Sequence, residues 1–208
     1  MASSPTALPQ GSVQRGALLI FLTLGTHPQP FERALDWALA ARGDEDLVIQ
    51  HGSTPPRSGE SGVRWIEFAP YEEMVELIRV SSVTVCHAGV GTAVTVVEAG
   101  RRPVLLPRLS VHGEHVDDHQ LQIGRELESA GYVVTCTRGD ALPEAIGKAR
   151  RMPPRPSRPP TALLRAAIEA GGGNPHRSRE AQLGSTAVPE DKSLSGRAGM
   201  PPRSHPSG

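Results

Sequence analysis

The sequence predicts an α/β protein with one doubly wound parallel sheet, followed by a basic tail without a core of its own. Three observations support this prediction. Short apolar runs alternate with segments of helical periodicity, several of these runs end at glycine, and proline and glycine concentrate near the end of the chain. Strands that alternate with helices form parallel βαβ units, which bind ligands at the carboxyl ends of their strands. Chemistry is therefore expected in the residues that follow each strand.

The first half of the predicted core contains three strands and two helices. After a polar segment at 1–16, which we expect to be flexible, the run ALLIFLTLG at 17–25 is typical of a buried strand that stops at glycine. Apolar residues recur at helical spacing in 31–41, and Pro28 and Pro30 mark where this helix can begin. Two strands and a helix follow, at 46–52, 63–68 and 71–80.

The second half repeats the alternation. A buried strand at 81–89 again ends at glycine and leads into a helix at 91–100. The remaining predicted elements are a strand at 102–107, a helix at 117–131, a strand at 132–137 and a short helix at 142–150. We therefore expect the folded domain to span 17–150.

The charge is divided unequally between this domain and the tail. Residues 1–150 carry 13 Lys and Arg against 18 Asp and Glu, whereas 151–208 carry 9 against 4. An acidic domain argues against nucleic-acid binding, which needs clustered Lys and Arg. The tail at 151–208 has ten prolines, seven glycines and no aromatic residue, so we expect it to be disordered, with one apolar stretch at 162–170. Contact with a membrane or an acidic partner is the alternative for this tail.

Cysteine usage and hydropathy predict a soluble cytoplasmic chain. Cys86 and Cys136 are isolated in apolar runs, which is typical of reduced thiols in a core. The longest apolar run, ALLIFLTL, is far shorter than the ~20 residues that a membrane-spanning helix needs. The amino terminus also lacks the pattern of a signal peptide.

A glycine-rich turn, HAGVGT, lies between the strand at 81–89 and the helix at 91–100. Glycines there let the backbone approach a phosphate, and the unpaired N–H groups and dipole of the helix start favour a negative charge. A plain glycine turn is the alternative interpretation. The dinucleotide pattern GxGxxG is not completed, because Val94 stands at its last position, and NAD binding is therefore the second hypothesis.

Two further groups of polar residues follow. Glu98, six residues after Thr92, is a candidate for accepting ribose hydroxyls, although a solvated helix glutamate is the alternative. The loop HGEHVDDHQLQ at 112–122 is dense in His, acid and amide groups, which suit either a metal ion or a sugar. Its spacing fits no common zinc pattern, so we expect no metal. The acidic string at 44–46 precedes a strand and is expected to be a solvated turn.

Three motifs in one order resemble the carboxyl-terminal domain of family 28 glycosyltransferases. They are TLGTHPQPFERAL, HAGVGTAVTVVEAGRRPVLLP and GEHVDDHQ, and the resemblance covers about 18–150. It is greatest to short exopolysaccharide subunits that stand alone as half of an enzyme, and a similar division exists in the dolichol-pathway N-acetylglucosaminyltransferase. The resemblance implies a Rossmann-like fold, the carboxyl-terminal half of the GT-B architecture.

The resemblance also implies roles for individual residues. Gly25 and Thr26 would face the donor diphosphate, the HAGVGT turn would cap it, and Glu98 would hold the ribose. The turn at Phe68 would pass beside the uracil. The predicted donor-binding residues are Gly25, Thr26, Phe68, His87, Ala88, Gly89, Gly91, Thr92, Glu98, His115, His119 and Gln120, with His119 and Gln120 at the sugar and His27 as the local candidate for the catalytic base. Many relatives have two glycines where this chain has Ala88 and Gly89, and the tail has no counterpart in the family.

The implied function is that of a donor-binding catalytic subunit of a two-component inverting glycosyltransferase. It would transfer a hexosyl group from a UDP-sugar to a lipid-linked saccharide in polysaccharide biosynthesis, with no cofactor and with the helix start neutralising the leaving diphosphate. Its partner would be a membrane-associated amino-terminal-half subunit that recruits it to the inner face of the plasma membrane. The alternatives are a non-catalytic partner of another transferase and an NAD-dependent or epimerase-like enzyme, the epimerase needing a second domain in the same chain.

Overall fold

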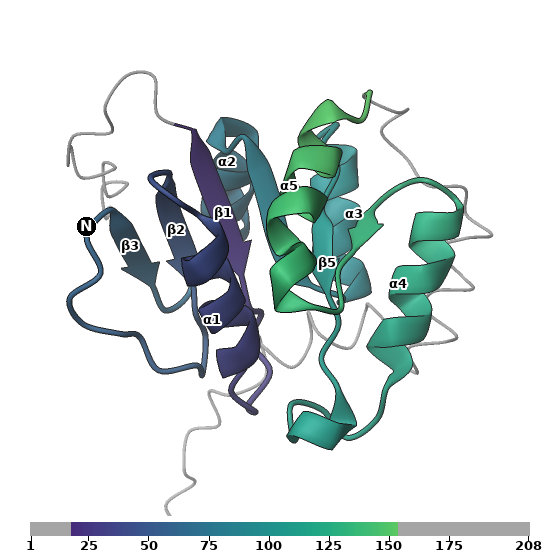
Figure 1. The fold of residues 1–208 in the computed structure, drawn as a ribbon, viewed down its shortest axis with the longest axis horizontal. Helices are drawn as coiled ribbons and strands as arrows, with labels where there is room; N and C mark the ends of the chain where they lie inside the picture. Colours follow the sequence, from purple (N-terminus) through teal and green to yellow (C-terminus); the bar gives the residue numbers. More distant parts are fainter. Residues whose placement is uncertain (1–17, 154–208) are drawn as a thin grey trace, which may run out of the picture. The chain divides into compact units, whose positions relative to one another are not determined.

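A computed structural model describes residues 18–153 of the chain, and its centre is a six-stranded sheet (Figure 1). All strand pairs are parallel, in the order β3-β2-β1-β4-β5-β6. The strands are β1 (Leu19–Thr23), β2 (Asp46–Gln50), β3 (Val63–Ile66), β4 (Val83–His87), β5 (Val104–Leu106) and β6 (Val134–Thr135). The predicted doubly wound parallel sheet is confirmed.

Helices cover both faces of the sheet (Figure 1). Their bounds are α1 (Glu32–Ala41), α2 (Tyr71–Val80), α3 (Val90–Glu98), α4 (His119–Ser129) and α5 (Leu142–Arg151). Helices α1 and α5 pack on one face, while α2, α3 and α4 pack on the other. Two short 3-10 helices, η1 (Ser110–His112) and η2 (Gly139–Ala141), were not expected from the sequence, because three residues are too few to show a helical period.

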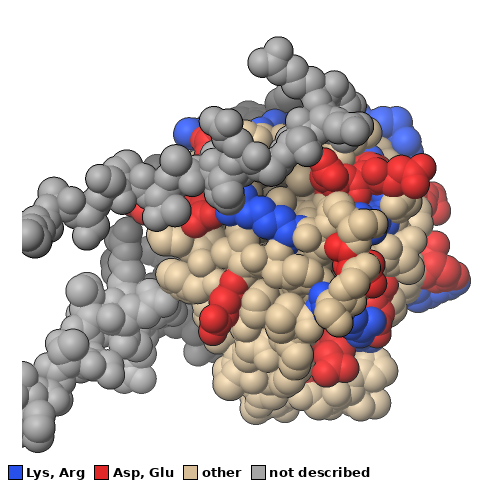
Figure 2. Space-filling model, turned by 90° about the vertical axis from the view of Figure 1, so that its left-hand side faces the viewer, with Lys and Arg blue, Asp and Glu red and all other residues tan. Residues whose placement is uncertain are grey.

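The strand order reverses at β1, which pairs with β2 on one side and with β4 on the other. In such sheets the connections leave in opposite directions on either side of this point, which opens a crevice at the carboxyl ends of the strands. We call this end of the sheet the carboxyl edge, and it is the lower end in Figure 1. Figure 2, turned about the vertical axis, shows charged side chains over the upper and right-hand parts of one face and a mostly uncharged lower part.

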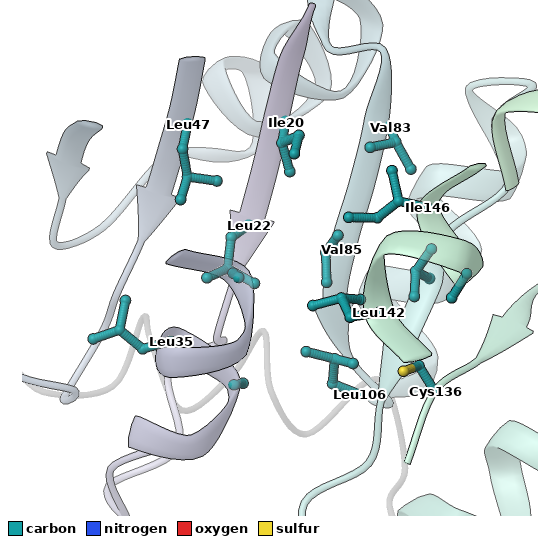
Figure 3. Close-up of a cluster of buried hydrophobic side chains, with 14 of the residues drawn as sticks. Ile20, Leu22, Leu35, Leu47, Val83, Val85, Leu106, Cys136, Leu142 and Ile146 are labelled. Carbon is teal, nitrogen blue, oxygen red and sulfur yellow. The ribbon is translucent and has the colours of Figure 1, made fainter. Parts of the chain in front are cut away.

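Alternation along the strands divides the core into the two faces. Ile20 and Leu22 of β1 pack with Leu35 of α1, whereas Phe21 between them packs with Ile78 of α2 on the other face. Figure 3 shows the first of these clusters, in which side chains of α1 and α5 meet the sheet. Burying a side chain of this size contributes roughly 1.5–3 kcal/mol, so the sheet and its helices form one cooperative unit that can hold loops in place at its edge.

The strands are shorter than the apolar runs that predict them. Leu24 is fully buried and its N–H donates to the carbonyl of Gln50, yet it lies beyond the end of β1. The same holds at β6, where only Val134 and Thr135 pair with β5. Apolar runs indicate burial, and burial continues past the last residue of a strand into the loop that follows it, so these runs are longer than the strands.

Several predictions concern residues outside the described part of the chain. The flexible segment at 1–16 lies outside it, and so does nearly all of the tail at 151–208, including the apolar stretch at 162–170. Within 18–153, Cys86 and Cys136 are buried and unpaired, as expected of core thiols. Among the helices described, none combines the length and the apolar character needed to cross a bilayer.

Candidate functional site

Three loops meet at the carboxyl edge beside the point where the strand order reverses. They follow β1 (24–31), β4 (88–89) and β5 (107–118). The sequence motifs TLGTHPQP, HAGVGT and GEHVDDHQ supply these loops, so tertiary folding joins three segments that lie far apart in the chain. The loops are connected through the side chains described below.

The imidazole of His87 lies between two glycines. A Cβ atom added to Gly25 would lie 2.7 Å from the Cε1 atom of His87, and one added to Gly89 would collide with its Nε2 atom. Gly25 also has a φ of +77°, a conformation that favours glycine. Ala88, between His87 and Gly89 in the chain, is fully buried and packs in the core with Cys86, so its methyl group is directed away from the loop surface. The loops after β1 and β4 therefore close on the His87 ring only because Gly25 and Gly89 lack side chains.

Helix α3 begins directly behind this ring. Its N-cap is Gly89, and no side chain caps its first turn within the described region. Gly91 is exposed with open space around its α-carbon, and Thr92 is half-buried. The N–H groups of this first turn have no partner within the helix, and the helix dipole places partial positive charge there. The start of α3 is thus suited to bind an anion such as a phosphate.

A second group of side chains consists of His27, His115, Asp117 and His119. The His27 and His115 rings stack with their centroids 4.6 Å apart, and the His115 and His119 rings meet edge to face at 4.5 Å. The carboxylate of Asp117 lies 3.3 Å from the Nδ1 atom of His115 and contacts the Nδ1 atom of His119. Its hydrogen bonds with the His119 side chain and backbone lower the pKa of Asp117. The structure therefore brings together three of the predicted residues: His115 and His119 contact the Asp117 carboxylate, and His27 stacks on His115.

Two of the histidines are neutral at pH 7. Burial, and next the charge of Arg108, lower the pKa of His87 to about 4, which the backbone of Thr23 only partly opposes. Burial and the neighbouring His115, followed by Arg108, also lower the pKa of His27. A neutral imidazole can accept a proton, so the state of His27 suits a general base.

Arg108 ties the loops after β1 and β5 together. It follows β5, is almost fully buried, and donates to the carbonyls of Leu24 at 3.0 Å, Gln29 at 2.7 Å and Glu114 at 3.1 Å. Burial lowers its pKa to about 10, so it stays charged at pH 7. The Glu114 carboxylate in turn pairs with Arg33 of α1 at 2.6 Å. These residues were not predicted from the sequence, where the available signal was a charged residue directly after the apolar run PVLLP.

Gln50 has the corresponding position between the loops after β1, β2 and β3. This buried side chain accepts a hydrogen bond from the Thr23 hydroxyl at 2.6 Å and donates to the carbonyls of Gly25 at 3.3 Å and Glu67 at 3.2 Å. It was also missed, because an amide at the end of a strand has no pattern of its own. Gln50 and Arg108 together hold the loop at Gly25 from both sides.

Of the remaining predicted residues, two are exposed at the carboxyl edge and one is buried. Thr26 is exposed on the first loop, and Phe68 is exposed after β3 at the same edge. Gln120 is buried, and its Oε1 atom accepts the backbone N–H of Arg108 at 3.1 Å. That amide oxygen therefore helps to hold the loop after β5. The sequence-based prediction gave Gln120 only a role at the sugar.

Glu98 is not brought to this group. It is the last residue of α3 and is exposed, whereas the first turn of α3 lies at the carboxyl edge. Six residues of helix separate it from Thr92, a rise of about 9 Å toward the opposite edge of the sheet. Arg101, three residues after Glu98, donates to the carbonyl of Arg79 at the end of α2. This bond places the end of α3 beside the amino ends of the strands. The geometry gives no support to the predicted ribose contact.

The acidic string at 44–46 lies at the amino ends of the strands as well. Asp46 begins β2, and Glu45 forms an ion pair with Arg150 of α5, with 3.0 Å between its Oε1 atom and the Nη1 atom of Arg150. This placement agrees with the expectation that the string lies away from the ligand.

A model of the glycosyltransferase family 28 C-terminal domain matches residues 19–170. The chain belongs to this family. The match includes the three loops of the site and continues past the predicted domain end at 150, into the segment that the sequence analysis assigned to the tail. Resemblance to family 28 in the sequence motifs is thereby confirmed.

Solved structures with a similar fold are glycosyltransferases about twice as long. The glycosyltransferase of kitacinnamycin has a TM-score of 0.53 at 20% identity, over 86% of this chain and 46% of that one. CalG4, the calicheamicin glycosyltransferase, has a TM-score of 0.53 at 14% identity, over 85% and 46%. SnogD from Streptomyces nogalater has a TM-score of 0.50 at 19% identity, over 88% and 47%. The family 28 chain thus spans about half the length of these GT-B structures. A search of curated protein sequences found no match.

Proposed function

We propose that this family 28 domain binds a UDP-sugar and transfers its hexosyl group to a lipid-linked saccharide, as the catalytic half of a two-component inverting enzyme. The observation that carries the proposal is the pairing of a helix start, which no side chain of residues 18–153 caps, with a histidine cluster at the same edge of the sheet. The helix start suits a diphosphate leaving group, and the cluster suits the sugar and the proton transfer.

The diphosphate would lie over the first turn of α3. Gly91 leaves open space there, and the Gly25 and Gly89 loops bring backbone close to the same region. A leaving diphosphate gains negative charge as the glycosidic bond breaks, and N–H groups already aimed at it stabilise that charge without reorganisation. The acceptor hydroxyl must lose a proton in the same step, and His27 is the base we propose, because its pKa is lowered and its ring is held by the stack on His115.

The acceptor groove would come from a partner subunit that covers the carboxyl edge. Four large apolar side chains lie exposed on loops or helix starts at this edge, namely Phe68, Tyr71, Val111 and Val116, with exposed fractions of 55%, 61%, 80% and 79%. Figure 2 shows few charged side chains in the lower part of one face, which corresponds to this edge. The similar solved chains continue for roughly another domain length, so an amino-terminal-half subunit, membrane-associated and therefore close to a lipid-linked acceptor, is the partner we propose.

Reconstitution tests the proposal. The chain would be co-purified from its native cell, the bound protein identified, and transfer from a radiolabelled UDP-sugar measured for the chain, the partner and the mixture. We expect transfer only from the mixture, because half of the cleft is missing from either component. A partner that transfers sugar at the same rate without this chain would instead support a non-catalytic role for the family 28 domain.

A further inference from the structure

We infer that His115, Asp117 and His119 form a binding site for a divalent transition-metal ion of the zinc class. Each of the three side chains offers one ligand atom, and these atoms all lie within 4.8 Å of one another. From the sequence we expected no metal, because the spacing of these residues matches no common zinc pattern. Folding of the loop nevertheless brings the three ligand atoms to one place.

The local backbone explains how three closely spaced residues converge. The segment 115–119 is the turn that enters α4, and the N–H of His119 donates to the carboxylate of Asp117 at 3.2 Å. In this turn the Nδ1 atoms of His115 and His119 both lie beside the same carboxylate oxygen of Asp117. In a regular helix the pattern i, i+2, i+4 would direct the middle residue to another face, so only the turn makes this spacing a ligand set.

The chemistry of the set selects the class of metal. Two imidazoles and one carboxylate are the protein ligands of catalytic zinc sites such as His₂Glu, and also of non-haem iron sites. Magnesium and calcium prefer oxygen ligands and fit two imidazoles poorly. Asp117 is about half exposed on its side chain, at 57%, whereas His115 and His119 are at 12% and 19%. The histidines are therefore held in place, while the carboxylate side stays open to solvent and to a further ligand.

The position of the set links it to the donor, a link that rests on the proposed function. His27 stacks on His115 from the loop after β1, and Gly25 of the same loop lies against the His87 ring, next to Gly89 at the start of α3. An ion held by three protein ligands keeps at least one coordination position for water or for an oxygen of the donor. The inferred ion would thus lie on the sugar side of the diphosphate-binding turn.

Metal binding can be measured without any donor or partner. The full chain, without a polyhistidine tag and after treatment with a chelator, would be titrated with Co²⁺ and followed by visible absorption, and with Zn²⁺ by calorimetry. We expect one ion per chain and the absorption of a protein-bound, low-symmetry Co²⁺ site. Asp117→Asn and His119→Ala should each weaken binding by tenfold or more. His112→Ala is the matched control, because His112 is exposed on η1 three residues before the cluster, and it should leave the affinity unchanged.

Each outcome decides the inference. Absence of binding, or binding that His112→Ala weakens as much as His119→Ala, would overturn it. Thermal unfolding of the metal-free variants shows whether they fold, and His119→Gln replaces His119→Ala if the latter does not. Binding of UDP in the presence of a chelator is measured separately. If UDP binds but Co²⁺ does not, the metal inference fails and the proposed donor site stands. If Co²⁺ binds but UDP does not, the metal inference stands and the proposed donor site fails.

Discussion

At the scale of single residues, the site depends on how one imidazole is enclosed. His87 ends β4 and is held between Gly25 and Gly89, two positions where a side chain would meet its ring. Enclosure removes water from the ring and keeps it neutral, since charging a buried imidazole is unfavourable. The same enclosure positions the loop that leads into α3. The two glycines and the histidine therefore act as one unit, and changes at any of them should have measurable effects on stability.

We predict that Gly89→Ala destabilises the domain by about 1–3 kcal/mol, because the added methyl group must displace the His87 ring in a well-packed place. Gly91→Ala is the control two residues away. Its methyl group would meet nothing within 4 Å, and alanine favours helix, so stability should stay equal or rise. Urea unfolding of both variants measures the difference. Equal stabilities would show that the loop adjusts freely around His87.

We also predict that acid weakens the fold through His87. In the unfolded chain the pKa of His87 is near 6.5, the ordinary value for histidine, whereas in the folded chain burial lowers it to about 4. The unfolded state therefore holds more protons between these values, and the free energy of unfolding should fall by roughly 3 kcal/mol as the pH drops from 6.5 to about 4. Urea unfolding at several pH values would measure this, with His87→Gln as the control that loses this part of the pH dependence. An unchanged pH profile in His87→Gln would contradict the prediction.

At the scale of elements, the start of α3 and the loop after β5 have different roles in the proposed site. The start of α3 lies at the carboxyl edge, and no side chain of the described residues caps it, while Arg108 holds the neighbouring loops through three carbonyls. The start of α3 thus has N–H groups suited to bind an anion, and Arg108 of the loop after β5 fixes the loops that carry His27 and His115. Each should respond differently to substitution: α3 in ligand affinity, and Arg108 in stability.

For α3 we predict that Gly91→Val lowers the affinity for UDP by about tenfold, since its side chain would enter the open space over the first turn and block a phosphate. Glu98→Ala, at the other end of the same helix, should leave the affinity within twofold. Calorimetry with UDP on the reconstituted complex measures both. A loss of affinity in Glu98→Ala would restore the ribose role that its sequence position suggested.

For the loops we predict that Arg108→Lys costs about 3 kcal/mol of stability. Lysine cannot reproduce the planar fork that contacts the carbonyls of Leu24, Gln29 and Glu114, and buried carbonyls left without donors are unfavourable. Arg125→Lys, on the exposed side of α4, is the control and should change stability by less than about 0.5 kcal/mol. Thermal unfolding compares the two, and similar midpoints would show that Arg108 does not hold the loops.

At the scale of the whole molecule, the carboxyl edge is the surface we propose for the partner. The chain spans about half the length of the similar solved structures, and its exposed Val111 and Val116 lie in the loop after β5 that also contains His115. Covering this edge would exclude water from the diphosphate and strengthen the electrostatic interactions of the site. Association and catalysis should therefore be lost together.

We predict that Val111→Asp and Val116→Asp abolish co-purification of the partner, because a charge at the centre of an interface must be desolvated. Val80→Asp is the control, since Val80 is 55% exposed but ends α2 at the opposite edge. Pull-down of the partner followed by a transfer assay measures both properties. Loss of the partner in Val80→Asp, with retention in the other two variants, would place the interface elsewhere.

The sequence alone determined the parallel α/β fold, and it pointed to the segments where we predict the chemistry. The helix predicted at 71–80 has those bounds in the structure, because Pro70 precedes it and its apolar spacing is regular. The glycine turn at 87–92 and the loop at 112–122 were both predicted to bind polar ligands. Helix starts and glycine turns depend on residues only a few positions away in the chain. Residues so close in the sequence stay close in the fold, so such features can be predicted from the sequence.

Only the tertiary structure decided which of these residues meet. It aligned His27 with His115 and His119, revealed Arg108 and Gln50 as the residues that hold the loops, and separated Glu98 from Thr92 along one helix. The physical reason is that strand order and helix direction are set by packing between segments tens of residues apart. A spacing of six residues on a helix is a distance of about 9 Å, whereas 88 residues between His27 and His115 become one ring stack.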